Sequence, residues 1–427
     1  MLCLCLIILT ILLIISSILF FPTIKIGPVR LASYWVIAFL CAILLFLFKQ
    51  VSWESIMDSF TANTSVNPIK ILVLFISMTI LSIFLDEIGF FRYIALKATK
   101  WVKGSQIKLF FGLYALISLL TVFTSNDIII LTFTPFICYY SKNAKINPVP
   151  YLFLEFVAAN TWSMALIIGN PTNIYLASTL EIDFFTYLKN LILPTLGASI
   201  ISLILLFLIF RRYLKTPMNE FHNEAIQPNL FLLIIGLTHL ILTTILLTIS
   251  SYIQVEMWLI TISFASSLLI IVTTYLVCKR KQLTLIKMTL LRAPWSLIPF
   301  VLSMFVLVLA LNEQGISSQI CDFMSQFQPV YAYGVSGVLC ANLINNIPMS
   351  VLYSNLLISA ESKAIYASII ASNIAAFITP LGALAGIMWM RLLKTFDIHF
   401  SFKRFILYGT IIGVPTLLGA LTILYYL

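Results

Sequence analysis

Long apolar runs recur from one end of this sequence to the other, and they constrain its fold more than any other feature. A helix needs about 20 apolar residues, within a range of about 17 to 25, to cross a lipid bilayer. Hydrophobic residues make up 61% of the chain and charged residues only 9%, which excludes a soluble globular protein. The sequence therefore predicts an all-α polytopic membrane protein with about 10–12 transmembrane segments. The runs cover residues 2–21, 31–48, 69–85, 109–140, 151–180, 191–210, 230–249, 257–278, 293–311, 330–359, 364–393 and 405–427.

The positions of the basic residues predict how these segments are oriented. Most of the 25 Lys and Arg residues fall in five loops between runs, which the positive-inside rule makes cytoplasmic. The loops at residues 51–67 and 181–189 are then external. Because the net charge of +10 follows this topology, we expect a plasma or inner membrane protein and no nucleic-acid partner. The loop cations are Lys25, Arg30, Arg92, Lys97, Lys100, Lys103, Lys108, Arg211, Arg212, Lys215, Lys279, Arg280, Lys281, Lys287, Arg292, Arg391, Lys394, Lys403 and Arg404.

An internal repeat is visible without gaps. Residues 67–94 match residues 293–320, so that Pro68 aligns with Pro294 and Glu87 with Glu313. The first copy ends at a cytoplasmic loop, whereas the second copy starts from one, so the two copies cross the membrane in opposite directions. This pattern predicts two inverted-topology repeats, at residues 68–215 and 292–427, as in secondary transporters. Residues 1–67 would add N-terminal transmembrane helices, and residues 216–291 would link the repeats through further transmembrane helices.

The run at residues 109–140 contains the stretch TSNDIIILTFTP, in which Ser125, Asn126 and Asp127 interrupt an apolar sequence. As one straight helix this run would be about 48 Å long, whereas the hydrocarbon core of a bilayer is about 30 Å thick. We therefore expect a break at residues 124–127, which leaves a helix followed by a second helix or a re-entrant arm. Pro135 adds a further weak point.

Further polar breaks occur in ANLINNIPMSV, AANTWSMALIIGNPTN and ASNIAAFITPLG, at corresponding places in the two repeats. A broken helix frees backbone N–H and C=O groups at membrane depth, which is tolerated only where they line a cavity in the protein. The breaks therefore predict a site for a polar solute or ion. The alternative is that small polar residues and kinks only assist helix packing. The candidate binding residues are Ser125, Asn126, Asp127, Asn160, Asn170, Thr172, Asn173, Asn345, Asn346, Asn373 and Thr379.

Asp127 is the most distinctive of these residues, because it lies inside a break with long apolar stretches on both sides. A carboxylate at membrane depth is costly, and it therefore indicates a function. It could carry a coupling proton or bind Na⁺, and it could also cap the following half-helix by accepting backbone hydrogen bonds. Glu155 is a second candidate for proton handling. We expect Asp86, Glu87 and Glu313 at helix boundaries near water.

A series of short motifs runs along the chain in the order LDEIGFFRYIAL, SND with a following TP, AAN, RAPWSLI, NEQG, NNIP and TPLGALAGIMW. This order resembles that of the arsenite-efflux permeases in the ion transporter superfamily. The resemblance implies two repeats of hairpins and unwound helices around a central site. It implies export of arsenite or antimonite by proton antiport, sometimes with a soluble ATPase subunit. The implied binding groups are Asn126, Asp127, Asn170, Asn173, Asn345, Asn346, Asn373 and Thr379.

The sequence leaves the substrate open. GNPTN, at residues 169–173, resembles the wider superfamily, which includes Na⁺-coupled carboxylate and sulfate transporters and Na⁺/H⁺ antiporters. No Lys or Arg falls within residues 109–141, 146–188 or 293–362, so the motif segments offer no fixed positive charge to a di- or tricarboxylate. A neutral solute such as As(OH)₃, or a small cation, needs none. We therefore favour proton-coupled efflux of arsenite or antimonite over H⁺- or Na⁺-coupled transport of small anions and over Na⁺/H⁺ antiport.

Other functional classes fit the sequence less well. HExxH and GxSxG motifs are absent, the histidines (His222, His239 and His399) are scattered, and the seven cysteines show no CxxC spacing. We therefore expect neither an enzyme nor a metal site, and no cofactor other than a coupling ion, H⁺ or alternatively Na⁺. A channel is a less favoured alternative, since broken helices also build selectivity filters. The direction of transport and the formation of a homodimer are left open.

Overall fold

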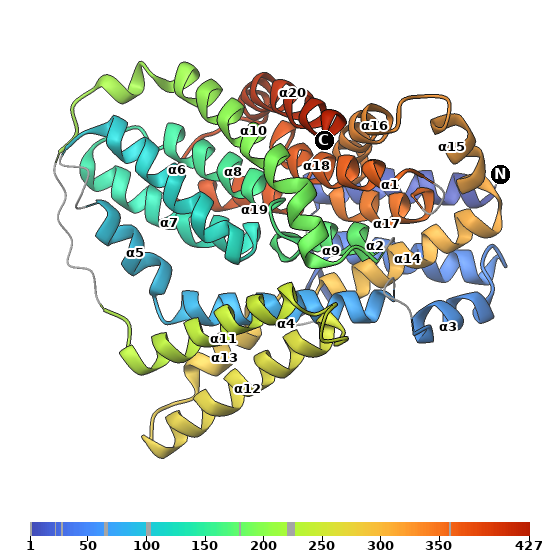
Figure 1. Ribbon diagram of the computed structural model, residues 1–427, viewed down its shortest axis with the longest axis horizontal. Coiled ribbons are helices and arrows are strands. Elements are labelled where there is room, and N and C mark those ends of the chain that lie inside the picture. The colour runs from blue at the N-terminus through green and yellow to red at the C-terminus, as the bar shows by residue number, and fades with distance from the viewer. Residues whose placement is uncertain are drawn as a thin grey trace.

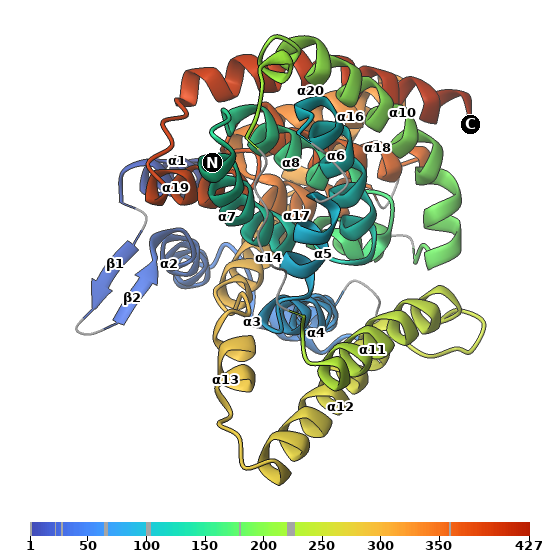
Figure 2. The ribbon, with the colours of Figure 1, turned by 90° about the vertical axis from the view of Figure 1, so that its left-hand side faces the viewer.

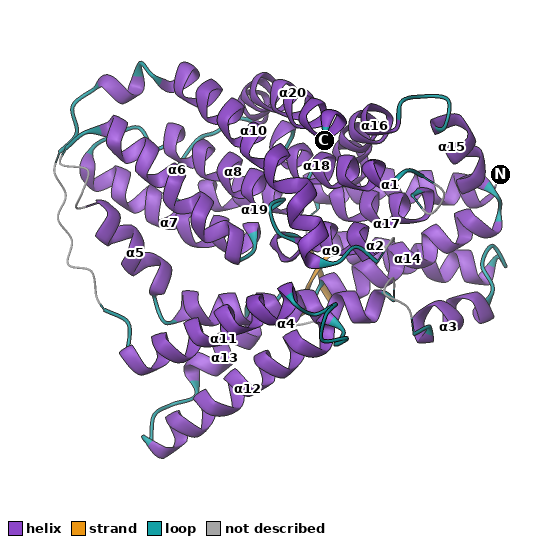
Figure 3. Cartoon of the chain, in the orientation of Figure 1, coloured by secondary structure: helices purple, strands orange, loops and turns teal. Residues whose placement is uncertain are grey.

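The computed structural model of the protein describes residues 2–21, 23–26, 29–63, 67–99, 104–178, 181–219, 227–357 and 360–427. Within these residues the chain is almost entirely helical, and short loops connect the helices (Figure 3). Two short strands, β1 (Thr23–Ile26) and β2 (Val29–Ala32), form an antiparallel hairpin that the sequence does not predict. Lys100, Lys103 and His222, which entered the sequence predictions, lie outside the described residues.

The helices fall into two series that follow the same order. The first series is α1 (Leu2–Phe20), α2 (Ser33–Leu47), α3 (Trp53–Thr61), α4 (Pro68–Glu87), α5 (Phe90–Thr99), α6 (Gln106–Phe123), α7 (Asn126–Ala144), α8 (Val149–Trp162), η1 (Ile167–Gly169), α9 (Pro171–Ser178), α10 (Phe184–Phe210) and η2 (Tyr213–Lys215). The second series is α11 (Leu230–Thr248), α12 (Met257–Cys278), α13 (Thr284–Leu291), α14 (Leu297–Glu313), α15 (Ile316–Met324), α16 (Pro329–Ile344), α17 (Asn346–Leu356), α18 (Ser362–Ile378), α19 (Leu384–Thr395) and α20 (Phe402–Tyr426).

Six helices in the described part of the chain are long and apolar enough to cross a membrane, namely α4, α6, α10, α11, α12 and α20. The pair α14 and α15 would add a seventh span, although the chain bends by 81° between them. The apolar helices α1, α2, α16 and α18 are shorter. The predicted all-α polytopic membrane protein with broken helices is therefore confirmed.

The elements from α4 to α10 are repeated from α14 to α20. In each series a long helix and a short helix lead to a broken pair, which is α6 and α7 in the first half and α16 and α17 in the second. A second break follows, between α8 and α9 and between α18 and α19. In Figure 1, α4 leads to α5 on the left of the molecule and α14 leads to α15 on the right, so the two series run in opposite directions. The domain boundaries at residues 67, 215 and 291 stay a prediction.

The helices that precede each series also correspond, and they pack across the two halves. Helices α1, α2 and α3 come before α4, as α11, α12 and α13 come before α14. Helix α2 packs against α14 of the second half, whereas α12 packs against α4 of the first half. Helices α10 and α20 also pack together, and Figure 2 shows them on the side of the molecule opposite to α11, α12 and α13. Each half is thus completed by helices of the other.

Helices α8 and α18 form the centre of the protein. Every residue of α8 from 150 to 161 is buried, and so is every residue of α18 from 364 to 378. Helices buried on all sides are apolar around their whole circumference, and small residues such as Ala159 and Ala375 allow close helix packing. Asn160 and Asn373, which are both fully buried in these helices, need internal hydrogen-bond partners.

Candidate functional site

The first break separates α6 from α7. Thr124 has an extended backbone, and Ser125 is the N-cap residue of α7, which begins at Asn126. The Ser125 hydroxyl and the Asn126 side-chain oxygen are buried, and neither has a hydrogen-bond partner among the described residues. Asp127 follows in the first turn, where the positive end of the helix dipole favours a negative charge. The predicted break at residues 124–127 is confirmed, and it leaves polar atoms free.

The corresponding break in the second half lies at Asn345, between α16 and α17. Its φ of 80° and ψ of 153° lie in a region that is essentially restricted to glycine, so the backbone at this break is strained. The Asn345 side chain donates a hydrogen bond to the Leu381 carbonyl (3.2 Å). Asn346 donates its backbone N–H to the Gly382 carbonyl (3.0 Å) and its side-chain amide to the Ser372 carbonyl (3.3 Å). The start of α17 is therefore fixed to the second break of the same half.

Each second break depends on a glycine that lies against the preceding helix. A Cβ atom on Gly169 would be 2.1 Å from the Ser163 carbonyl oxygen, and a Cβ atom on Gly382 would be 2.1 Å from the Ala375 carbonyl oxygen. Real Cβ contacts are essentially never this short. Only glycine therefore lets the chain fold back at these two places before it continues into α9 and α19.

Asn373 of α18 is the centre of a buried hydrogen-bond network that joins the two halves. Its Oδ1 accepts hydrogen bonds from Ser163 Oγ (2.7 Å) and Asn170 Nδ2 (3.1 Å). Its Nδ2 donates to Asn173 Oδ1 at 2.7 Å. The hydroxyl oxygens of Thr172 and Ser372 lie 3.0 Å apart, which adds a second link between α9 and α18.

Asn160 has the matching position in α8, but its contacts stay within the first half. Its Oδ1 accepts a hydrogen bond from Asn126 Nδ2 (2.9 Å), and its own Nδ2 donates to the Phe156 carbonyl (2.8 Å). Asn160 thus orients the side chain of Asn126, and it leaves Asn126 Oδ1 as a free acceptor.

A cavity of about 180 Å³ lies where these breaks meet. Five of the predicted binding residues line it, namely Ser125, Asn126, Asp127, Asn170 and Asn346. The other predicted residues are not on its lining. They are Asn160, Thr172, Asn173 and Asn373, which form the networks behind the cavity, and Asn345 and Thr379, which hold turns at the second-half breaks.

The cavity is also lined by residues that the sequence prediction did not name. Tyr34 comes from α2, and Ser296 is the N-cap residue of α14. Their hydroxyl oxygens lie 2.9 Å apart, and the Tyr34 ring packs edge-on against Phe300 with 5.0 Å between ring centroids. Nothing in the sequence singles out Tyr34, whereas Ser296 lies in the RAPWSLI motif.

A fixed positive charge, Arg292, lies on the lining of the same cavity. From the sequence we expected no Lys or Arg at the site, and this is wrong for the folded protein, because Arg292, the first residue of the RAPWSLI motif, lies on the lining. Arg292 Nη2 is 2.7 Å from Asp86 Oδ2, and Nη1 is 2.5 Å from Glu87 Oε1. These carboxylates lie at the end of α4 as predicted, but they are only 11% and 17% exposed, so they face the arginine more than water.

The two carboxylates predicted to handle protons lie in different surroundings. Asp127 is half-buried on the cavity lining, and it accepts no hydrogen bond from the described residues. Glu155 is fully buried and is not on the lining. The Thr134 hydroxyl lies 3.0 Å from each of its carboxylate oxygens. Asp127 is therefore the one in direct reach of a solute.

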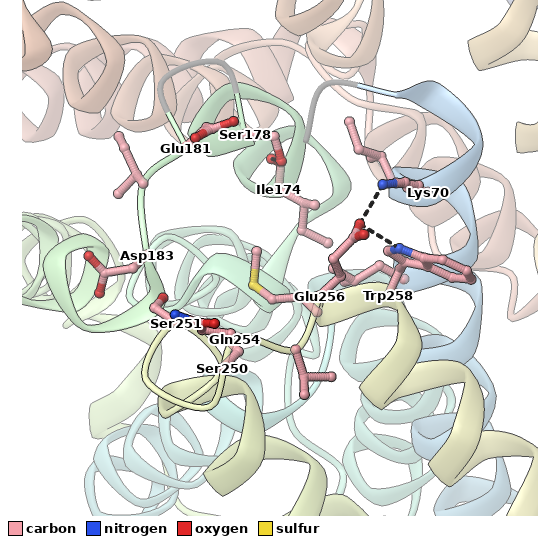
Figure 4. A pocket seen from close by; sticks show the side chains of 15 residues that line it. Lys70, Ile174, Ser178, Glu181, Asp183, Ser250, Ser251, Gln254, Glu256 and Trp258 are labelled. Atoms are coloured by element: carbon pink, nitrogen blue, oxygen red, sulfur yellow. Dashed lines mark hydrogen bonds and ion pairs between the residues drawn. The ribbon is translucent and has the colours of Figure 1, made fainter. Parts of the chain in front are cut away.

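A second cavity, of about 270 Å³, lies between α4, the end of α9 and the loop that joins α11 to α12 (Figure 4). Glu256 Oε2 is 2.5 Å from Lys70 Nζ and accepts a hydrogen bond from Trp258 Nε1 at 2.8 Å. The hydrogen bond from Lys70 lowers the pKa of Glu256. Glu181 and Asp183 add further carboxylates. None of the predicted binding residues lines this cavity, so the smaller one is the candidate site.

Helices broken inside apolar runs, with amide side chains and free polar atoms at the breaks, define a multi-pass secondary transporter of the cell membrane. The match to a family model agrees with this class. The model, CitMHS, is described as "Citrate transporter" and matches residues 11–368, and the chain belongs to this family.

Relatives and a solved structure are similar to this chain over most of its length. It is 26% identical over 392 residues to a Bacillus subtilis (strain 168) protein whose name provisionally calls it an arsenical pump membrane protein, covering 83% of this chain and 86% of that protein. It is 24% identical over 382 residues to the Arsenical pump membrane protein of Escherichia coli (strain K12), covering 82% and 84%. The resemblance to arsenite permeases is thereby confirmed.

The crystal structure of the Alcanivorax borkumensis YdaH transporter, described as having an unusual topology, has a similar fold. The TM-score is 0.58 at 14% sequence identity, and the match covers 99% of this chain and 95% of that chain. At this identity the similarity concerns the fold alone.

Proposed function

We propose that this protein exports arsenite or antimonite from the cytoplasm in exchange for protons. One observation carries the proposal. Among the described residues that line the central cavity, Asp127 is the only carboxylate, and it accepts no hydrogen bond from them. A carboxylate at membrane depth that the protein leaves unpaired is free to take up a proton or a solute. The names of the relatives support the substrate class.

The exchange follows from the acceptors that the cavity offers. As(OH)₃ is neutral, and its hydroxyl groups donate hydrogen bonds. Among the acceptors at the cavity lining are Ser125 Oγ and Asn126 Oδ1, which have no hydrogen-bond partner among the described residues, and the ionised Asp127 carboxylate. A proton on Asp127 removes the strongest of these acceptors, so proton binding from the external side favours release of the solute there. Loss of the proton to the cytoplasm restores the site, as antiport requires.

The movement that exposes the cavity to one side and then the other is proposed from the fold class. We expect one bundle of broken helices to move against the remaining helices. A homodimer and a soluble ATPase subunit stay predictions.

Coupled transport of a small anion, driven by H⁺ or Na⁺, is the second candidate. The family description and the position of Arg292 on the cavity lining favour it. It ranks second because Arg292 is already bound by Asp86 and Glu87. Na⁺/H⁺ antiport would use Asp127 without any organic solute.

Uptake into inverted membrane vesicles tests the proposal, because export then appears as accumulation. We expect saturable accumulation of arsenite when the vesicle interior is acid, and loss of that accumulation when an uncoupler is added. Citrate, succinate and Na⁺ are supplied in parallel vesicles. Movement of these solutes without arsenite would contradict the proposal. Arsenite flux that neither saturates nor follows the proton gradient would indicate a channel.

A further inference from the structure

We propose that Asp86 and Glu87 set the selectivity of the central cavity by neutralising Arg292, so that the cavity rejects anions and accepts neutral hydroxylated solutes. This inference rests on the proposed function, because it concerns which solutes the same site takes. An unpaired guanidinium on a cavity lining is a strong site for carboxylate or sulfate, because its planar fork donates two parallel hydrogen bonds.

The contacts occupy that fork. Each terminal nitrogen of Arg292 has its own carboxylate, with Nη2 2.7 Å from Asp86 Oδ2 and Nη1 2.5 Å from Glu87 Oε1. A bound dicarboxylate or sulfate would be left with the remaining N–H groups of a guanidinium whose charge these carboxylates already neutralise. Asp86 and Glu87 are not among the residues that line the cavity, so they act on a solute through Arg292.

The net charge of the groups around the cavity also disfavours anions. The group consists of one guanidinium, Arg292, and three carboxylates, Asp86, Glu87 and Asp127. It therefore stays net negative whether Asp127 is ionised or protonated. An anion in the cavity meets repulsion in both states of the proposed cycle, whereas neutral As(OH)₃ does not.

The second half shows that the end of this long helix does not require an ion pair. Asp86 corresponds to Asn312, whose Nδ2 donates to Asn355 Oδ1 at 2.7 Å. Glu87 corresponds to Glu313, whose Oε1 lies 3.3 Å from both the backbone nitrogen and the hydroxyl of Ser52. At the end of α14, both side chains therefore have neutral hydrogen-bond partners. The ion pairs of Arg292 lie at the end of α4, on the side that the loop charges make cytoplasmic, where an exported solute enters.

Freeing the arginine tests the inference. The double variant Asp86→Asn with Glu87→Gln keeps the shape of both side chains and removes their charge. Titration calorimetry on the purified full-length proteins measures the Kd for succinate and for sulfate. We expect the wild type to show no binding at millimolar concentration, and the double variant to bind both anions with a Kd at least about tenfold below the wild-type limit. Adding Arg292→Gln should remove that gain. Glu313→Gln is the matched control, because it neutralises the corresponding glutamate, which forms no ion pair with a described arginine.

Binding and transport together separate this inference from the proposed function. If the wild type accumulates arsenite but the double variant gains neither anion binding nor inhibition of uptake by succinate, the selectivity role is overturned and the function stands. If the wild type binds succinate as tightly as the double variant does, the selectivity role is overturned whatever arsenite does. Absence of arsenite transport in the wild type overturns the function. Should the double variant not fold, Glu87→Gln alone, which keeps the Asp86 contact, must show a smaller gain of the same kind.

Discussion

Asn373 of α18 donates a hydrogen bond to Asn173 of α9 at 2.7 Å, although the two residues stand 200 positions apart and belong to opposite halves of the chain. Both side chains are fully buried. Asn373 also accepts hydrogen bonds from Ser163 and Asn170. A buried amide whose partners are all present fixes one geometry, so the second break of the first half is held in one position against α18 of the second half.

Loss of this amide should destabilise the whole protein. Asn373→Ala leaves buried donors and acceptors unpaired, and we expect the free energy of unfolding to fall by about 3 kcal/mol. Denaturant unfolding in detergent measures the change. The control is Asn143→Ala, because Asn143 is exposed and bonds only to the Tyr139 carbonyl among the described residues. A loss below about 1 kcal/mol for Asn373→Ala would contradict the central role of the network.

The glycine at the second break should not tolerate a side chain. Gly382→Ala places a Cβ 2.1 Å from the Ala375 carbonyl oxygen, so we expect a loss of about 3 kcal/mol or failure to fold. Gly112→Ala in α6 should do the opposite and stabilise by up to about 1 kcal/mol, because nothing lies within 4 Å of the added Cβ. The melting temperatures of the two variants are compared with that of the wild type. A melting temperature of Gly382→Ala equal to that of the wild type would contradict the role of this glycine.

Asp127→Asn should separate transport from stability. The side chain accepts no hydrogen bond from the described residues, so we expect the unfolding free energy to change by less than about 1 kcal/mol. Proton-driven arsenite uptake into inverted vesicles should fall by about tenfold or more, because the variant cannot exchange a proton. Unchanged dependence on the proton gradient in this variant would rule out the coupling role of Asp127.

Asn345 and Asn346 are neighbours with opposite expected effects. Asn346 lines the cavity, and its side chain makes one long hydrogen bond, so Asn346→Ala should raise KM for arsenite about tenfold with little loss of stability. Asn345 lies outside the lining and has a φ of 80°, which alanine adopts with strain. Asn345→Ala should therefore lower the melting temperature more than Asn346→Ala does, and it should raise KM less. The reverse order in the two assays would contradict this assignment.

The Lys70–Glu256 ion pair predicts a small dependence of stability on acid. Lys70 lowers the pKa of Glu256 below its ordinary value of 4.5. The stabilisation is therefore complete above that value and is lost as pH falls through the lower pKa of the folded protein. Because Glu256 is about half exposed, we expect Glu256→Gln to cost about 0.5 kcal/mol at neutral pH and progressively less as the pH falls below 4.5. Unfolding of both proteins across this range checks the sign; a cost that grows on acidification would refute it.

The breaks could be predicted from sequence because their causes are local. A polar cluster such as Ser125 to Asp127 inside an apolar run has no favourable place in a continuous membrane helix, and Gly169 and Gly382 mark the places where the chain folds back. The internal repeat could also be predicted, because residues 67–94 match residues 293–320 directly in the sequence.

The composition of the cavity could not be predicted in full, because it depends on packing between distant segments. Tyr34 reaches the cavity only because α2 lies against α14. Arg292 was assigned to a cytoplasmic loop, and no local signal shows that its guanidinium turns toward the breaks. Asn160 and Asn373 were predicted as ligands, but each lies behind the cavity, where its partners are amides of other helices.

At the position of Asp127 in the first half, the second half has Ile347. In the proposed exchange this asymmetry gives the cycle one proton carrier on the cavity and a solute without charge. Each turnover then moves one positive charge inward, so the membrane voltage itself drives export. A potential of 100 mV, negative inside, contributes about 2.3 kcal/mol per elementary charge. In inverted vesicles the sign of this potential is reversed. Inverted vesicles with no pH difference, but with a potassium diffusion potential that is positive inside, should therefore still accumulate arsenite.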